Sequence, residues 1–304
     1  MLLYTHAACL LHSAGPGHPE SPSRLQAVLE ALGGDKFAAL DRIEAPRATR
    51  EQLLRAHDAE LIDLIVAAVP KEAYARIDGD TVMCPHSLEA ALRAAGAVCA
   101  AIDATIDGTH TSAFCAVRPP GHHATHDQAM GFCLFNSVAV GAAHALARGV
   151  ERVAIVDFDV HHGNGTQDIF WNDARVMYAS THQWPLYPGS GSRDETGAGN
   201  IVNAPLPPGS GSREFRSACA QIVLPALRAF RPQLLMISAG FDAHALDPLA
   251  DMNLDAADYA WITRELVEVA IEHAGGRIVS SLEGGYSLTA LRQSAAAHVA
   301  ALMG

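Results

Sequence analysis

The sequence lacks the marks of several large protein classes. None of its six cysteines forms a C-x-x-C pair, so neither a zinc ribbon nor a disulfide framework is indicated, and scattered thiols favour a reducing compartment such as the cytoplasm. No apolar run approaches the roughly 18 residues of a membrane span. The stretch from Met1 to Gly15 has no positively charged start, so we do not expect it to be a signal peptide. Neither a Walker loop nor a G-x-G-x-x-G motif is present, so a nucleotide site has no support.

Basic residues are also scarce. The chain has 21 Lys and Arg against 33 Asp and Glu, which gives a net charge of −12. Binding to nucleic acid through its phosphates, or docking on an anionic membrane, needs charge of the opposite sign. An acidic chain mildly favours a cationic substrate. The composition is 49 % hydrophobic and 18 % charged, which is typical of a globular core and argues against a disordered chain.

Short apolar runs alternate with stretches of helical periodicity. Residues 152–158 predict a buried strand, because a continuous apolar run is expected where both faces of a strand are covered. Further strands are predicted at 112–117, 234–237 and 277–282. A capping box at 49–52 predicts a helix directly after it. Other helices are predicted at 21–33, 87–107, 136–148, 214–230 (kinked at Pro225), 255–275 and from 287 onward. The alternation implies parallel crossovers and a covered parallel sheet in one α/β domain, 1–304. Residues 183–213, rich in Gly, Ser and Pro, predict a loop.

Polar segments directly follow four of the predicted strands. They are RPPGHHA (118–124), DFDVHHGN (157–164), SAGFD (238–242) and EGGY (283–286). Ligands bind beyond the carboxyl ends of the strands in open α/β sheets. We therefore expect these four segments to converge on one site.

The segment 157–164 predicts a cation site. Asp157, Asp159 and His161 are spaced i, i+2, i+4, which places them on one face of an extended chain. Carboxylates that follow a buried strand need a neutralising partner, and a cation supplies one. Catalytic zinc usually takes three protein ligands, and Asp242 is the natural third beside Asp159 and His161. For any one of these acids alone, a hydrogen-bonded turn is the alternative interpretation.

Two other segments predict acid–base and oxyanion groups. His122 and His123 follow a stiff Pro-Pro-Gly turn, and adjacent imidazoles suit proton transfer beside a metal. Tyr286 follows Gly284 and Gly285, where its hydroxyl is placed to stabilise an oxyanion. The alternatives are two loop histidines and an aromatic side chain at a helix entrance.

Together with HPESPSR (18–24) and GFCLFN (131–136), these segments resemble the class II histone deacetylases, and the bacterial histone deacetylase-like amidohydrolases most of all. The resemblance covers nearly the whole chain in the expected order. It implies the arginase/deacetylase fold, a parallel sheet of about eight strands between helices. It also implies zinc-dependent hydrolysis that removes an acetyl or other acyl group from a lysine side-chain amine.

The resemblance also implies a role for each residue of the site. The implied zinc ligands are Asp159, His161 and Asp242. The implied catalytic residues are His122, His123, Tyr286, Asp157 and Asn164. Among them, Tyr286 polarises the acyl carbonyl and His123 is the better candidate for the general base. Asp157 orients His122, and Asn164 orients His123.

Two further groups of residues come from the resemblance alone. A structural K⁺ or Na⁺ ion would be held at Asp157, Asp159, His161, Ser180 and Thr181. A second such ion would use Phe170, Asp173, Val176 and Asn200, mostly through the backbone. The substrate channel would be lined by Gly131, Phe132, Tyr187 and Leu249. Relatives often have two Phe in this channel, and Tyr187 adds a hydroxyl to its wall.

Other functions compete with a lysine deacylase. The arginase branch of the fold uses two manganese ions with extra carboxylates at positions that are Gly163 and Gly240 here, which favours one metal. A non-catalytic binder of acylated proteins would be expected to have lost Tyr286 or a zinc ligand.

An acetylpolyamine amidohydrolase is the main alternative, because it shares the whole motif set. One polyamine group places an acidic gatekeeper where this chain has Leu249, but in the bacterial group acids come from other loops. Either Asp78 or Asp80 would be suited to hold a peptide backbone, and the sequence does not choose between them. The sequence leaves the oligomeric state open.

Overall fold

A parallel β-sheet forms the centre of the computed structural model, which describes residues 1–304. Its strand order is β2-β1-β5-β10-β9-β6-β7-β8, and every neighbouring pair is parallel. The strands are β1 (Leu2–Thr5), β2 (Asp41–Glu44), β5 (Ser112–Cys115), β6 (Val153–Asp157), β7 (Val176–Gln183), β8 (Ile201–Leu206), β9 (Leu234–Ala239) and β10 (Ile278–Leu282). A separate antiparallel pair is formed by β3 (Ala75–Arg76) and β4 (Val82–Met83). The predicted α/β fold with an eight-stranded parallel sheet is confirmed.

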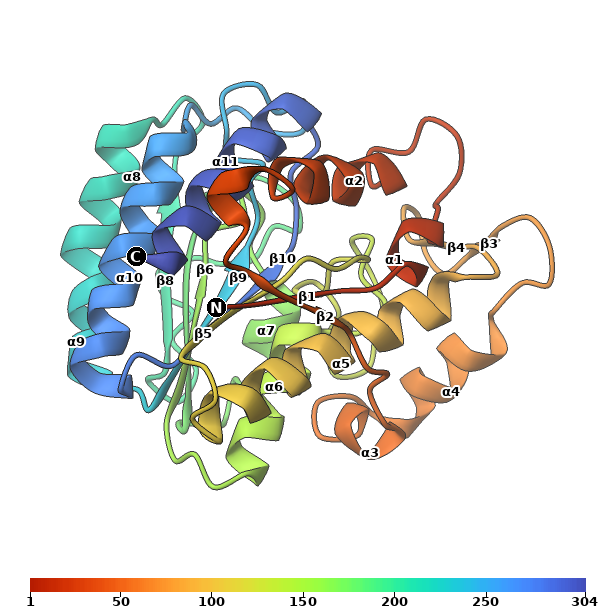
Figure 1. The fold of residues 1–304 in the computed structure, drawn as a ribbon, viewed down its shortest axis with the longest axis horizontal. Coiled ribbons are helices and arrows are strands. Elements are labelled where there is room, and N and C mark those ends of the chain that lie inside the picture. Colours follow the sequence, from red (N-terminus) through yellow and green to blue (C-terminus); the bar gives the residue numbers. More distant parts are fainter.

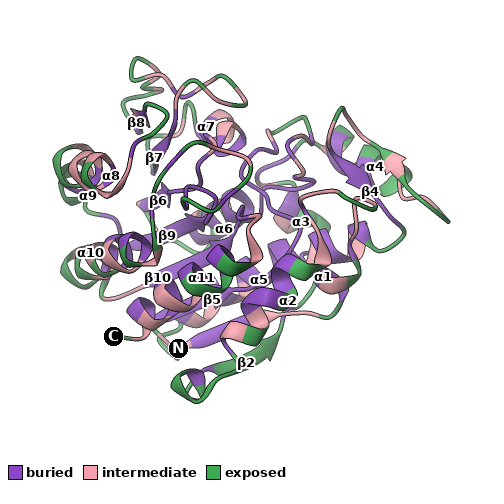
Figure 2. Cartoon of the chain, turned by 90° about the horizontal axis from the view of Figure 1, so that it is seen from above, coloured by how far each residue is buried: buried purple, intermediate pink, exposed green.

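Helices cover both faces of this sheet (Figures 1 and 2). On one side lie α8 (Ser212–Ala218), α9 (Leu224–Phe230), α10 (Ala256–Ala274) and α11 (Leu288–Met303), with α2 (Pro22–Ala31) packed on α11. On the other side lie α5 (Ser87–Ile106) and α6 (Ser137–Ala147). The shorter helices are α1 (Ala8–Leu11), α3 (Arg50–Leu53), α4 (Ala59–Ala67) and α7 (Asn164–Ile169).

Several helices begin at a residue whose side chain caps the helix through a local hydrogen bond. Thr49 and Gln52 form the predicted capping box: Thr49 Oγ1 accepts from the Gln52 N–H at 3.2 Å, and Gln52 Oε1 accepts from the Thr49 N–H at 2.8 Å. Asp255 accepts from the first-turn N–H groups of α10, and Ser287 does the same for α11. The Ser287 cap fixes the start of α11, directly after the segment that carries Tyr286.

The structure differs from the sequence prediction in the region 183–213. This region contains β8 as well as loops, and β8 pairs with β7 at the edge of the sheet. Pro205 and Asn203 interrupt the apolar pattern of this strand, and proline is tolerated there because an edge strand leaves one row of N–H groups unpaired. The predicted helix 214–230 is divided by a π-helical turn at Cys219–Val223, and α9 begins immediately after it with Pro225 in its first turn; the kink at Pro225 stays a prediction.

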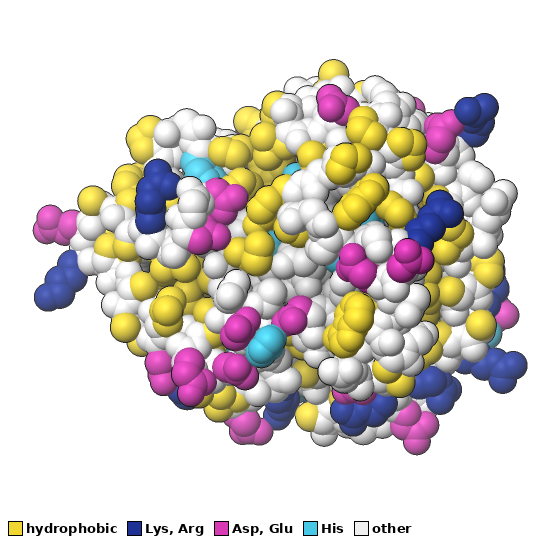
Figure 3. All heavy atoms as spheres, turned by 180° about the vertical axis from the view of Figure 1, so that it is seen from behind, with side chains coloured by type: hydrophobic (Ala, Val, Ile, Leu, Met, Phe, Trp, Pro, Cys, Tyr) yellow, Lys and Arg dark blue, Asp and Glu magenta, His cyan; other side chains and the backbone are white.

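Charged side chains are dispersed on the face shown in Figure 3. Lys and Arg lie mainly towards the rim, while Asp and Glu occur at several separate places on this face. None of the helices combines the length and the apolar character that crossing a membrane requires.

His298 joins three elements in the interior. Its Nδ1 forms a 2.6 Å hydrogen bond with Thr263 Oγ1 on α10, and its Nε2 forms a 2.8 Å hydrogen bond with Ser280 Oγ on β10. The ring is wholly buried, and burial lowers the pKa of His298 to about 3. The histidine therefore stays neutral in the folded protein at mildly acidic pH.

We predict that the free energy of unfolding falls as the pH falls from about 6.5 towards 3, because the unfolded chain protonates His298 in this window and the folded chain does not. The measurement is urea unfolding at about pH 7 and about pH 4.5, for the wild type and for His298→Gln. The variant starts less stable, since it loses buried contacts, but it loses less stability between the two pH values. Equal losses in both proteins would contradict this account.

Candidate active site

The four polar segments come from four strands that are neighbours in the middle of the sheet, in the order β5, β10, β9, β6. Because the strands are parallel, the four segments leave from the same edge. There the ligand atoms of Asp159, His161 and Asp242 all lie within 4.8 Å of one another. His161 Nδ1 lies 3.1 Å from Asp159 Oδ1 and 3.2 Å from Asp242 Oδ2.

This Asp-His-Asp cluster needs positive charge. Asp159 and Asp242 are both buried, and Asp242 Oδ2 makes no well-aligned hydrogen bond, although it lies 3.2 Å from His161 Nδ1. Burial, and then the negative charge of Asp159, raise the pKa of Asp242 to about 7. Burial opposes the charge on His161, but the two carboxylates outweigh it and raise the pKa of that imidazole to about 10. A divalent cation would satisfy the same demand.

The space around the carboxylates fits such a cation. A Cβ atom at position 240 would collide with the carboxylate of Asp159, and one at position 284 would collide with that of Asp242. Both positions are glycine, so the oxygens lie in a cradle that is kept free of side chains. Two carboxylates and one imidazole form a ligand set that suits zinc and leaves a position open for water or substrate.

The tandem histidines have different partners. His122 Nδ1 is 3.0 Å from Asp157 Oδ2, and His123 Nδ1 is 2.8 Å from Asn164 Oδ1, as the resemblance implied. Burial disfavours a charged His122, but the carboxylates of Asp159 and Asp157 overcome this and raise its pKa to about 10. Burial and the neighbouring charge of His122 lower the pKa of His123 well below its ordinary value. At neutral pH the site thus holds one charged imidazole beside one neutral imidazole.

A cavity of about 240 Å³ leads to these groups. Its walls include His123, His161 and Tyr286, together with all four predicted channel residues, Gly131, Phe132, Tyr187 and Leu249. The ring of Tyr187 lies edge-on to that of His123, with centroids 5.2 Å apart. The backbone at Gly131 has a φ of +57°, and a Cβ there would come within 2.6 Å of the His123 ring. Glycine at this position lets the channel wall approach the proposed base.

The structure distinguishes the two acids that the sequence left open. Asp78 Oδ1 accepts from the N–H groups of Asp80 (3.0 Å) and Thr81 (2.6 Å), so Asp78 shapes its own loop. Asp80 lines the cavity, together with Leu186, which sequence reasoning did not single out.

Comparison with known proteins shows the family of this chain. The model of the histone deacetylase domain matches residues 18–302. The chain belongs to the histone deacetylase family. It is 42 % identical to a histone deacetylase-like amidohydrolase of Pseudomonas aeruginosa, over 92 % of this chain and 80 % of that protein. It is 37 % identical to histone deacetylase 14, chloroplastic, of Arabidopsis thaliana, over 100 % of this chain and 77 % of that protein.

A solved structure, the HD domain of HDA15, superposes with a TM-score of 0.93 at 37 % identity and covers 100 % of this chain and 91 % of that one. Membership of the family supports an amidohydrolase that acts on acylated amines.

Two anchors of the histone deacetylase site carry no local sequence signal for their function. Glu283 Oε2 accepts from the N–H groups of Gly121 (2.6 Å) and His122 (3.2 Å), and so holds the tandem-histidine turn. The Tyr178 hydroxyl donates to Asp157 Oδ2 at 3.1 Å, beside the contact that Asp157 makes with His122. Only the fold brings Glu283 and Tyr178 to these backbone and carboxylate groups.

Arg24 is a third anchor. It is buried, and its Nε donates to the Gly285 carbonyl at 2.6 Å while its Nη2 donates to the Glu283 carbonyl. Its guanidinium lies 4.8 Å from the centre of the Tyr286 ring. Asp247 Oδ2 accepts from the Tyr286 N–H at 2.6 Å. Tyr286 is therefore held through both its ring and its backbone.

The first monovalent-cation site that the family resemblance implies is brought together in part by strand pairing. Asp157 on β6 lies directly opposite Ser180 on β7, and both are fully buried. Thr181 follows at 5 % exposure. Occupation of this site by K⁺ or Na⁺ stays a prediction.

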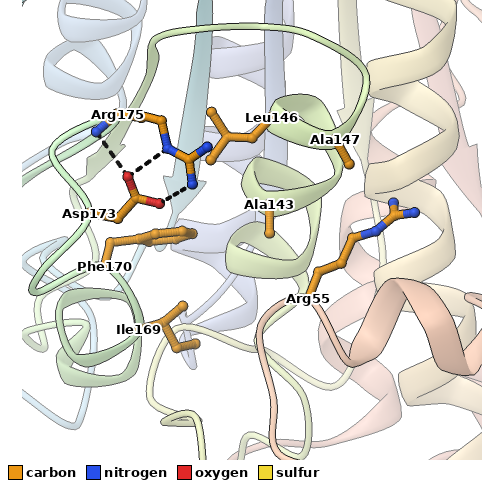
Figure 4. Close-up of a pocket in the computed structure, with 8 residues that line it drawn as sticks. All are labelled: Arg55, Ala143, Leu146, Ala147, Ile169, Phe170, Asp173 and Arg175. Carbon is orange, nitrogen blue, oxygen red and sulfur yellow. Dashed lines mark hydrogen bonds and ion pairs between the residues drawn. The ribbon is translucent and has the colours of Figure 1, made fainter.

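The residues of the second implied site do not fit a bare cation. The side-chain Nδ2 of Asn200 lies where the backbone carbonyl oxygens converge, 2.8 Å from that of Phe170, 3.2 Å from that of Asp173 and 2.7 Å from that of Val176. The Asp173 carboxylate is engaged elsewhere, by the guanidinium of Arg175 (Figure 4). The Asn200 amide thus satisfies the oxygens that a monovalent ion would need.

We predict that Tl⁺, a heavy analogue of K⁺, does not bind beside Asn200 in crystals of the wild-type protein. In Asn200→Gly the three carbonyl oxygens lose their donor, and a Tl⁺ ion is expected to take its place. Anomalous scattering from crystals grown in Tl⁺ checks both proteins. A wild-type Tl⁺ peak bound to the three carbonyls, with the Asn200 side chain displaced, would show that the amide does not replace the ion.

Proposed function

We propose that this protein is a zinc-dependent deacylase that removes an acetyl or other acyl group from the side-chain amine of lysine. The observation that carries the proposal is the cavity of about 240 Å³, with apolar walls at Phe132, Leu186 and Leu249, which ends at His123, His161 and Tyr286. A narrow apolar channel suits the methylenes of an acylated lysine, and the polar end suits hydrolysis of its amide.

Asp159, His161 and Asp242 would hold the zinc ion. When bound, zinc supplies Lewis-acid polarisation of the acyl oxygen and of water. His123, held neutral, accepts the proton of the attacking water. Its ring is fixed by Asn164, so Nε2 is the nitrogen left for this proton.

The remaining groups act on the charge that develops in the reaction. The Tyr286 hydroxyl, on the wall of the cavity, donates a hydrogen bond to the oxyanion that forms when water adds to the carbonyl. His122 pairs with Asp157, and the carboxylates of Asp159 and Asp157 raise its pKa, so it would supply positive charge within the site. The protonated histidine pair then returns a proton to the leaving amine, and a carboxylic acid and a free amine result.

A two-metal reaction of the arginase type is disfavoured by the packing. A Cβ at position 163 would collide with the Asp157 carboxylate and come within 2.6 Å of the Tyr178 hydroxyl, and one at position 240 would collide with Asp159. The positions that carry extra metal-bridging carboxylates in that branch therefore have no room for a side chain here.

An acetylpolyamine amidohydrolase is the second candidate, and one observation favours it. Asp80 lines the channel, where a carboxylate is able to attract the distant ammonium of an acylated polyamine. The same carboxylate is also suited to accept from the backbone N–H of a peptide. Leu249 and Leu186, which share the wall with Asp80, favour the lysine side chain.

The test compares kcat/KM of the zinc-loaded protein on an acetyl-lysine peptide and on N-acetylputrescine. We expect the peptide to be the better substrate, because the wall is mainly apolar. In the same assay, Tyr286→Phe is expected to lower kcat by about 10²–10³, the usual loss on removal of one oxyanion donor.

The control for Tyr286→Phe is an unchanged unfolding curve and unchanged zinc content. A near wild-type kcat would remove Tyr286 from the mechanism. A clear preference for N-acetylputrescine would replace the lysine deacylase with the polyamine enzyme.

A further inference from the structure

A second hollow, of about 370 Å³, lies beside the channel. Its wall includes Met130, Asn164, Asp168, Trp171, Pro188 and Ser190. Most of its lining residues are polar in type, and none of the motifs that suggested a deacylase assigns it a function.

The two hollows are lined by different residues that are neighbours in the chain or are hydrogen-bonded to one another. Met130 lines the second hollow and its neighbour Gly131 lines the channel. Likewise, Pro188 lines the second hollow and its neighbour Tyr187 lines the channel. Asn164 faces the second hollow and is hydrogen-bonded to His123, which faces the channel. The second hollow therefore adjoins the wall of the channel, and we expect the residues that flank an acylated lysine to pass close to it.

Asp168 and Trp171 form a pair at one side of this hollow. They lie three residues apart where α7 ends, and the Trp171 N–H donates to the Asp168 carbonyl at 3.2 Å, so their side chains are on the same face of the turn. Trp171 is 37 % exposed, which is unusual for an indole. Asp168 Oδ2 accepts from the backbone and ring N–H groups of His126, and this leaves Oδ1 for a ligand.

We propose that this hollow is a subsite for the cationic side chain of a Lys or Arg residue that flanks the acyl-lysine in a peptide substrate. This inference rests on the proposed lysine deacylase function. A carboxylate beside an exposed indole face attracts an ammonium or guanidinium group through charge and through the ring. The thioether of Met130 and the ring of Pro188 offer an apolar wall for the methylenes of such a side chain.

The experiment measures kcat/KM on acetyl-lysine peptides in which each flanking position in turn carries Arg, Ala or Glu. At one position we expect Arg to exceed Ala by about 3- to 10-fold, as an exposed ion pair and a cation–π contact together allow. Asp168→Asn and Trp171→Ala should bring the Arg-to-Ala ratio towards one. Trp171→Phe keeps an aromatic face and should keep part of the preference.

A matched control separates the subsite from the general negative charge of the protein. Glu151 is an exposed acid at the amino end of β6, the opposite edge of the sheet from the site. Glu151→Gln removes the same charge as Asp168→Asn and should leave the Arg-to-Ala ratio unchanged. An equal fall of the ratio in both variants would overturn the subsite.

The remaining outcomes distinguish this inference from the proposed function. If the peptides are hydrolysed equally well whatever their flanking residues, the subsite is wrong and the lysine deacylase stands. If no acetyl-lysine peptide is hydrolysed while N-acetylputrescine is, the proposed function fails. Turnover of N-acetylputrescine that falls in Asp168→Asn but not in Glu151→Gln would assign the hollow to the distal ammonium of a polyamine and overturn the peptide version.

Discussion

The need to neutralise buried carboxylates organises this molecule. Asp157, Asp159, Asp242 and Glu283 all lie at or just beyond the carboxyl ends of neighbouring strands, and each is at most 1 % exposed. Ionised carboxylates cannot remain in so small a volume without positive partners or hydrogen-bond donors. Glu283 receives backbone N–H groups, and Asp157 receives His122 and Tyr178. Asp242 Oδ2 makes no well-aligned hydrogen bond and has only the His161 imidazole at 3.2 Å, so a cation is needed most there.

A second layer of buried charge fixes the frame around these acids. Glu20 pairs with both Arg24 and Arg118 in the interior, and Arg118 also donates to backbone carbonyls near the N-terminus. Removing one partner from such a network usually costs about 3–5 kcal/mol, because a charge is left buried and uncompensated. Through Arg24, the same network reaches the carbonyls on either side of Gly284 and the ring of Tyr286. The segment 18–24 thus contributes to the site although none of its residues lines the channel.

The sequence predicts the residues of the candidate site better than it predicts the residues that hold them in place. Segments at strand ends are recognisable because polar residues interrupt a buried pattern, and this is why Asp159, His161 and Asp242 could be grouped before the fold was known. Asp80 could not be separated from Asp78, because the choice depends on which carboxylate turns back to bond its own loop. The edge strand β8 was missed because Pro205 and Asn203 break its pattern. Arg24 and the Asn200 amide depend on contacts between distant segments, and no local signal marks such contacts.

Metal stoichiometry shows whether one cation satisfies the Asp-His-Asp cluster. Calorimetric titration of metal-free protein with Zn²⁺, followed by thermal unfolding, reports both binding and its linkage to stability. We expect one tight site per chain, a rise in Tm on zinc addition, and loss of both in Asp242→Asn. Two tight sites per chain, or a tight site that survives in Asp242→Asn, would contradict this expectation.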